Sequence, residues 1–248
     1  MGMRIALLGA TGATGRLVIG AALRDGHEVH ALVRPARPGS AVRTLPLRDG
    51  LVQRTGDATD LESVAEIVKG CEAAICLVGP VREAAPDLCA RAATALVEAA
   101  RDTALARIVL VTGAMIGHPS DHTHGLYRVV PALLGAARED RLASERIVRE
   151  GMRGLGRAHV IVRPPRLGDG PTAGWVLAGP EIEIGTMDGI PRIDLAEVLL
   201  EAAGGRWDGG EIAVRAAHGD ERGAQAHMLP FGRSRSDTAR LPRRPTSP

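Results

Sequence analysis

Short apolar runs rich in Val and Ile alternate along the chain with longer segments whose apolar residues recur at helical spacing. This alternation is typical of a parallel β-sheet with crossover helices on both faces. The runs predict strands at Arg4–Leu8, Glu28–Val33, Leu51–Arg54, Ala73–Val78, Arg107–Thr112 and Ala158–Arg163. The intervening segments predict helices at Thr14–Asp25, Leu61–Lys69, Ala84–Asp102 and Glu139–Glu150. The expected fold class is therefore α/β, with a doubly wound parallel sheet in a three-layer arrangement.

The pattern weakens after the last of these strands. Glu181–Ile184 and Glu211–Arg215 have the length and alternation of short strands. Leu195–Ala203 is expected to form a helix that starts after Asp194. We interpret this part as a small C-terminal appendage on the substrate side of the sheet.

The end of the chain has a different composition. From about Ala216 onward Arg, Pro, Ser, Gly and His dominate, with too few apolar residues to form a core. The sequence therefore predicts a folded domain over residues 1–215 and a disordered Arg/Pro-rich tail over residues 216–248. The basic character of the tail suits nucleic acid or acidic lipid, but an unselected extension is the better interpretation. We expect no nucleic-acid partner.

Size and composition narrow the class of protein. With 248 residues, 45% of them hydrophobic, the chain is long enough for one α/β domain. Cys71, Cys76 and Cys89 are odd in number and lack CxxC spacing, so we expect buried, inert thiols and a reducing compartment. No segment approaches the roughly 18 uninterrupted apolar residues of a membrane span. We expect a cytoplasmic protein, monomeric or weakly homo-oligomeric, without a membrane partner.

The first strand leads into a glycine-rich run, GATGATGR, at residues 9–16. Gly9 allows a tight turn, Gly12 allows close approach of a pyrophosphate, and Gly15 allows the following helix to pack closely on the sheet. The N–H groups and the positive dipole of that helix then face the phosphates. An ordinary glycine-rich turn is the alternative, but the preceding strand and the following helix favour a Rossmann-type dinucleotide site.

The end of the second strand indicates which dinucleotide is bound. An acidic residue there, about 20 residues beyond the glycines, would bond the ribose 2′-hydroxyl of NAD. This chain instead has Arg34, followed by Arg37. Guanidinium groups suit a 2′-phosphate, so the expected cofactor is NADP(H). The alternative is that both are solvated surface arginines.

Later strand ends carry further candidates. Asp57 follows the third strand, where a carboxylate can meet the adenine ring, although a helix cap is an equal reading for a lone residue. Val78 and Gly79 close the fourth strand, and a glycine there lets the cofactor pass close to the backbone.

Four motifs occur in order: GATGATGR, LVRPAR, GDATD and IVRPPRLGDGP, each after a predicted strand or at its end. Together they resemble the atypical short-chain dehydrogenases with an NAD(P)-binding NmrA-like domain, nearest in pattern to the biliverdin-IXβ/flavin reductase type. The resemblance covers about Met3 to Val214. It implies that the cofactor is lined by Gly9, Thr11, Gly12, Ala13, Thr14, Gly15, Arg34, Arg37, Asp57, Ala58, Val78, Gly79, Thr112, Gly113 and Pro164.

The catalytic groups of such enzymes are not evident. Ordinary short-chain dehydrogenases use a tyrosine with a lysine four positions later, whereas the single tyrosine here, Tyr127, is followed at that spacing by Pro131. Flavin-reductase relatives have a serine after strand five and a histidine after the double proline, where this chain has Gly113 and Arg166. Arg166 and Trp175 are therefore expected on the substrate side, to hold an anionic group and stack on a flat ring.

Two functional readings remain. The first is an NADPH-dependent reductase of a flat conjugated acceptor such as flavin, quinone or a related pigment. The second is a non-catalytic, NmrA-like sensor of NADP(H). His118, His122 and His124 match no zinc template, so no metal is expected. A histidine of that loop could still supply a proton to the reaction.

Overall fold

The central layer is a mixed sheet in the computed structural model, which describes residues 2–35, 45–79, 85–118, 122–125, 134–218, 221 and 228–230. Within these residues nine strands lie in the order β11-β8-β10-β6-β5-β4-β1-β2-β3. The strands are β1 (Arg4–Leu8), β2 (Glu28–Val33), β3 (Leu51–Thr55), β4 (Ala73–Cys76), β5 (Arg107–Val111), β6 (Ala158–Arg163), β8 (Trp175–Gly179), β10 (Gly210–Ala216) and β11 (Met228–Pro230). β1 to β6 and β10 run parallel, and β8 and β11 pair antiparallel.

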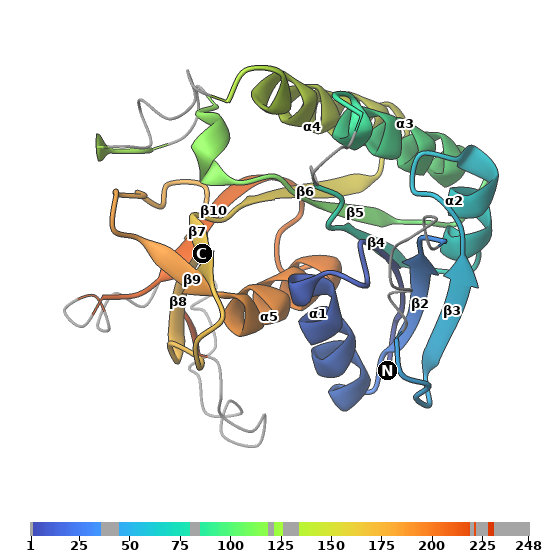
Figure 1. Cartoon of the computed structure of the whole chain (residues 1–248), viewed down its shortest axis with the longest axis horizontal. Coiled ribbons are helices and arrows are strands. Elements are labelled where there is room, and N and C mark those ends of the chain that lie inside the picture. The colour runs from blue at the N-terminus through green and yellow to red at the C-terminus, as the bar shows by residue number, and fades with distance from the viewer. Residues whose placement is uncertain are drawn as a thin grey trace, which may run out of the picture.

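Helices cover both faces of this sheet (Figure 1). They are α1 (Ala13–Arg24), α2 (Leu61–Val68), α3 (Leu88–Arg101), α4 (Ala136–Gly154) and α5 (Arg192–Ala203). α1 and α5 share one core with the sheet, while α2, α3 and α4 form a second core on the opposite face. The predicted three-layer, doubly wound Rossmann-type fold is confirmed.

A second, two-stranded sheet lies at the edge where the parallel strands end. It pairs β7 (Arg166–Gly168) with β9 (Gly189–Pro191). A short 3-10 helix, η1 (Ala114–Ile116), follows β5 at the same edge. β7 and β9 belong to the small C-terminal appendage that the sequence predicts after β6, and β7 follows the double proline directly.

Two predicted elements are placed differently by the structure. Glu181–Ile184 is not a strand: its apolar residues are buried and its glutamates exposed, but only one bridge, Thr123 to Ile184, pairs it. The edge strand is the preceding apolar run, β8. α5 begins at Arg192 and not after Asp194, which instead accepts hydrogen bonds from Ala173 N (2.7 Å) and Thr172 Oγ1 (2.5 Å).

Helix α3 starts later than predicted, at Leu88, because Pro86 disfavours helical backbone in the residue before it. Asp140 of α4 binds this N-terminus. Its two carboxylate oxygens accept hydrogen bonds from Cys89 N (2.9 Å) and Ala90 N (2.8 Å). A buried carboxylate from one helix thus satisfies the first free amides of another and fixes how α3 and α4 pack.

The sheet also continues past residue 215, where the sequence places the start of a tail. β11 pairs with β8 through Met228↔Leu177 and Pro230↔Trp175. The last strand therefore comes from a segment that composition alone did not distinguish from the basic C-terminal end.

We predict that Asp140→Ala lowers the free energy of unfolding by roughly 2–3 kcal/mol, because two buried amides lose a charged acceptor. Urea denaturation followed by circular dichroism measures this. Glu98→Ala, which removes an exposed ion pair with Arg101, is the matched control and should cost less than about 1 kcal/mol. Equal effects of the two changes would contradict the capping role.

Candidate functional site

The loop between β1 and α1 has the geometry of a phosphate-binding turn. Gly9 has φ +84°, and Gly12 N donates to Gly9 O at 3.1 Å. A Cβ on Gly15 would lie 2.4 Å from Gly9 O, so only glycine lets the first turn of α1 sit against the end of β1. The turn is therefore required by backbone sterics, as the sequence predicts.

The N-terminus of α1 is open to an anion. Gly12 is the N-cap, no side chain caps it, and no acidic residue lies in the first turn. Around it Thr11 and Thr14 are half-buried and Ala13 is exposed. Amide groups of an uncapped helix start, together with the helix dipole, attract a phosphate.

Arg34 and Asp57 follow the neighbouring strands β2 and β3. Gly56 N donates to Val33 O at 3.0 Å, which brings the two strand ends together. Burial would raise the pKa of Asp57, but hydrogen bonds from Thr59 N and Oγ1 (both 2.8 Å) and the charge of Arg34 outweigh it. The pKa lies below its ordinary value, and the carboxylate stays charged beside an exposed guanidinium. Ala58 is partly buried and packs against the core that contains α2. Arg37 lies outside the described residues.

The ends of β4, β5 and β6 meet at the same edge. Val78 is buried, and at Gly79 no atom lies within 4 Å of where a Cβ would be, so the surface there is open. Gly113 has φ +128°, and the following residue, Ala114, donates its N–H to Pro164 O at 2.9 Å. The structure thus brings the predicted residues after β5 and β6 into direct contact.

Thr112 is held by a buried ion pair that the sequence did not reveal. Glu145 and Arg149 are spaced for a surface pair on α4, but Glu145 is only 1% exposed. Its carboxylate binds Arg163 through Nε (3.0 Å) and Nη2 (2.6 Å) and accepts the Thr112 hydroxyl at 2.6 Å. Arg149 hydrogen-bonds Glu211 at 2.6 Å, and its Nη2 lies 3.8 Å from Glu145, so the pair that the i,i+4 spacing on α4 favours is present. Glu145 is nevertheless buried, and its shorter contacts are with Arg163 across the sheet, a partner that an amphipathic period does not show.

This arrangement restricts what Thr112 can do. A hydroxyl has one proton to donate, and that of Thr112 goes to Glu145. Toward a ligand at this edge Thr112 can therefore only accept a hydrogen bond.

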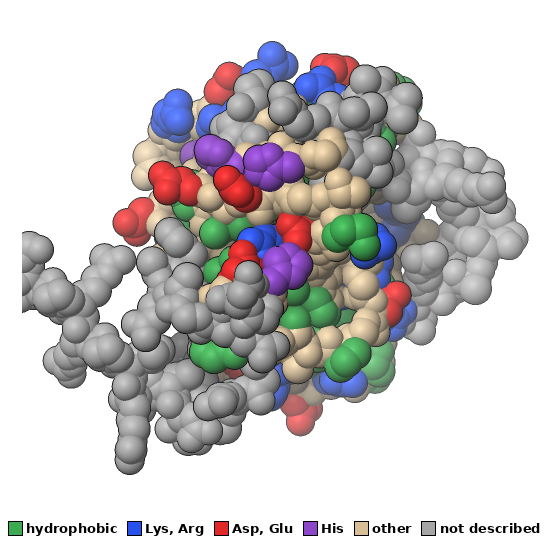
Figure 2. All heavy atoms as spheres, turned by 90° about the vertical axis from the view of Figure 1, so that its left-hand side faces the viewer, with side chains coloured by type: hydrophobic (Ala, Val, Ile, Leu, Met, Phe, Trp, Pro, Cys, Tyr) green, Lys and Arg blue, Asp and Glu red, His purple; other side chains and the backbone are tan. Residues whose placement is uncertain are grey.

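Of the two residues predicted on the substrate side, one lies in the small sheet and the other begins β8 of the main sheet. Arg166 is exposed at the start of β7 and pairs with Gly189. Trp175 is half-buried at the start of β8, and its carbonyl accepts a hydrogen bond from Ala217 N at 3.0 Å. Figure 2 views the side of the molecule that carries β7 to β10, where histidine, basic and acidic side chains gather near its centre.

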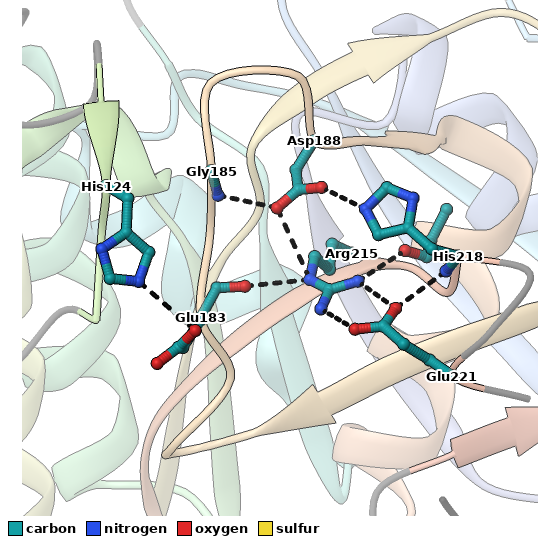
Figure 3. Close-up of polar contacts among 8 residues, drawn as sticks. His124, Glu183, Gly185, Asp188, Arg215, His218 and Glu221 are labelled. Carbon is teal, nitrogen blue, oxygen red and sulfur yellow. Dashed lines mark hydrogen bonds and ion pairs between the residues drawn. The ribbon is translucent and has the colours of Figure 1, made fainter. Parts of the chain in front are cut away.

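Four charged or titratable residues on this side were missed by the sequence reasoning. Asp188 precedes β9, Arg215 is the penultimate residue of β10, and His218 and Glu221 follow β10; their side chains converge (Figure 3). The stretch AAHGDERG, residues 216–223, falls within the tail that the sequence predicts. No motif marks these residues, because the partners come from segments about 30 residues apart and meet only in the folded sheet.

Other expected features have plain outcomes. The three cysteines are buried and unbridged, as predicted, and burial raises the pKa of the Cys71 thiol to about 12. Among the described residues no three His, Cys, Asp or Glu side chains gather as a metal site. In the same residues, no helix has the length and apolar character that crossing a bilayer requires. Tyr127 lies outside the described residues.

Residues 9–204 match the NAD(P)H-binding family, and the matched segment begins at the first glycine of the phosphate loop. The chain belongs to this family. The match agrees with the expected relation to atypical short-chain dehydrogenases. Glu145 and Arg163 both lie within the matched residues. The NmrA-like assignment within that group stays a prediction.

Solved structures share the fold of this NAD(P)H-binding protein at low sequence identity. ChuY, an anaerobillin reductase from Escherichia coli O157:H7, is 19% identical with a TM-score of 0.63, covering 86% of this chain and 97% of its own. A protein from Streptococcus pneumoniae assigned as an NADH-flavin reductase is 19% identical, with a TM-score of 0.65 and coverage of 87% and 100%. A Bacillus halodurans protein assigned as an NAD-dependent epimerase/dehydratase is 20% identical, with a TM-score of 0.65 and coverage of 87% and 95%.

We predict that Glu145→Ala destabilises the protein by about 3–5 kcal/mol, because the Arg163 guanidinium, 3% exposed, loses its buried carboxylate. Thermal and urea unfolding measure the change. Glu139→Ala on the same helix is the control, since Glu139 is 71% exposed in its pair with Arg138. A cost below about 1 kcal/mol for both variants would show that the buried pair is not stabilising.

Proposed function

We propose that this protein is an NADPH-dependent reductase that transfers a hydride to a flat, conjugated acceptor such as a flavin, a quinone or a related pigment. The observation that carries the proposal is the turn at residues 9–15, which opens an uncapped α1 N-terminus at the carboxyl edge of a parallel sheet. Doubly wound sheets bind ligands at this edge. The membership in the NAD(P)H-binding family supports a nicotinamide cofactor there.

The preference for NADPH rests on Arg34. Its exposed guanidinium follows β2, where a carboxylate would favour NAD, and it lies close enough to Asp57 to lower the pKa of that carboxyl. A 2′-phosphate offers charged acceptor oxygens to such a guanidinium. Asp57, which accepts a hydrogen bond from Thr59 N, would lie toward the adenine side of the site.

The class of acceptor is supported by the edge itself and by similar structures. ChuY is an anaerobillin reductase, and the Streptococcus pneumoniae protein is assigned to flavin reduction. Flavin N5 accepts a hydride directly, so positioning the two rings contributes much of the rate. Thr112, Gly113 and Pro164 would line the nicotinamide, with Arg166 and Trp175 beyond it on the acceptor side.

One observation favours a second function, a non-catalytic NADP(H)-sensing protein. The chain has a single tyrosine, and Pro131 stands where the lysine of the ordinary tyrosine–lysine pair would be. A sensor needs the cofactor site and no proton donor. Turnover separates the two functions.

We expect the purified protein to oxidise NADPH when FMN, FAD or a small quinone is added at saturating cofactor. The loss of NADPH absorbance measures the reaction, and calorimetry measures cofactor binding separately. Tight NADPH binding without loss of absorbance with any acceptor would favour the sensor. Absence of binding of either nicotinamide nucleotide would contradict both functions.

We expect Arg34→Ala to weaken NADPH binding about 10- to 100-fold while leaving NADH binding nearly unchanged, because only the 2′-phosphate loses a charged hydrogen bond. Titration calorimetry with both nucleotides tests this. Arg101→Ala, which removes an exposed arginine at the end of α3, is the matched control. Equal losses for NADPH and NADH would contradict the assignment of Arg34.

A further inference from the structure

His218 and Asp188 form a hydrogen-bonded pair on the acceptor side of the sheet. His218 Nε2 lies 2.7 Å from Asp188 Oδ1 (Figure 3). The His218 side chain is 57% exposed, whereas that of Asp188 is 10% exposed. An exposed imidazole oriented by a nearly buried carboxylate is the arrangement of a proton-transfer group. We propose that His218, oriented by Asp188, donates the proton that accompanies hydride transfer to the bound acceptor.

Asp188 is fixed from several directions. Its other oxygen, Oδ2, accepts a hydrogen bond from Gly185 N at 2.7 Å and lies 3.5 Å from Arg215 Nε. The two oxygens are therefore committed to different partners, and Oδ1 is directed at His218. A carboxylate held in this way cannot turn away from the imidazole without breaking the turn that contains Gly185.

Arg215 holds the rest of the cluster in place. It donates to the Glu183 carbonyl at 2.9 Å and to the Glu221 carboxylate at 2.7 and 2.5 Å. These bonds to Arg215 bring the pKa of Glu221 to about 2 and raise the pKa of the guanidinium above its ordinary value. Glu221 in turn accepts the backbone N–H of His218 at 2.8 Å. Both ends of the histidine are thus tied to a scaffold that stays charged at neutral pH.

The pair leaves one ring nitrogen for a ligand. A carboxylate can only accept, so Nε2 is the donor to Asp188 and Nδ1 is directed away from it (Figure 3). The charged groups of the described chain that face His218 are Asp188 before β9, Arg215 on β10 and Glu221 after β10. Among the described residues, two carboxylates and one guanidinium leave one net negative charge beside the ring.

The position of the pair matches the expected acceptor site. Ala217, next to His218, donates its N–H to the carbonyl of Trp175 at 3.0 Å. Asp188 precedes Gly189, which pairs with Arg166 in the small sheet. The pair is therefore connected through neighbouring backbone to both residues predicted to contact the acceptor. β10 runs parallel to β6 with Ala213 beside Arg163, so His218 lies at the same edge of the sheet, four residues beyond the level of Pro164.

The reaction consumes one proton for each hydride transferred, and His218 would supply it. Hydride from C4 of NADPH adds two electrons and one hydrogen to the acceptor, leaving it with a negative charge. The N–H bond at His218 Nδ1 breaks as a new N–H or O–H bond forms on the acceptor, and solvent then reprotonates the imidazole. The products are NADP⁺ and the reduced, neutral acceptor. Gly113 and Arg166, which replace the serine and histidine of the flavin-reductase relatives, leave this role to a residue from another strand.

The inference rests on the proposed reductase function, and kinetics with a small quinone test the chemical step. His218→Ala should lower kcat about 100-fold, the lower range for general acid catalysis, and leave NADPH affinity unchanged. Free imidazole should restore part of the rate.

His30→Gln is the matched control. His30 Nε2 also binds a carboxylate, that of Glu28 at 2.6 Å, but His30 lies on β2, far from β10 in the strand order. It should retain the unaltered kcat. Asp188→Asn should lower kcat with little change in the KM for the quinone. An unchanged kcat in His218→Ala, or a loss that imidazole does not restore, overturns the proposal.

A second measurement does not depend on turnover. With NADP⁺ bound, oxidised FMN should shift the ring C–H signal of His218 in the proton NMR spectrum, assigned by its loss in His218→Ala, but not the signal of His30. If NADPH binds and no acceptor is reduced, the reductase function fails while this shift still reports an acceptor beside His218. Absence of the shift at saturating FMN overturns the placement of His218 in either case.

Discussion

The close packing of the first turn of α1 against the end of β1 is the contact on which the cofactor site depends. A single added carbon at Gly15 would overlap the carbonyl oxygen of Gly9. That contact places the N-terminus of α1 at the edge of the sheet. The N-cap there is Gly12, so no capping side chain binds the first amides of α1. The free amides are satisfied only by solvent or by an anion, so a steric requirement in the backbone becomes an electrostatic preference for phosphate.

A buried ion pair positions the other part of this edge, where β5 and β6 end. The Glu145–Arg163 pair joins α4 to the last residue of β6 and reaches Thr112 after β5. Desolvating such a pair is costly unless its geometry is complete. Every contact in it is short and directional, so the ends of β5 and β6 are held at one fixed spacing. The edge at β1 is thus set by backbone sterics, and the edge at β5 and β6 by a buried ion pair.

Much of this could be read from the sequence, for a physical reason. The strands β1, β2 and β6 lie at the predicted residues, because a buried parallel strand must be apolar on both faces and leaves a continuous run. The glycine loop was found because its sterics admit few other residues. The burial of Glu145 and the place of His218 do not follow from the sequence, because their partners, Arg163 and Asp188, are set by tertiary contacts that no local period encodes. Glu181–Ile184 is a similar case. Its alternation correctly predicts which side chains are buried, but it does not show whether another strand lies beside the segment.

The pairing of β11 with β8 bears on how the end of the chain is treated in practice. β8 has β10 on one side and β11 on the other. Trimming the protein at the point where its composition turns basic would remove β11 and leave the backbone groups of Trp175, Val176 and Leu177 exposed on a bare edge. Exposed apolar edges recruit strands from other molecules. A shortened version made for crystallisation would therefore risk aggregating through the exposed edge of β8.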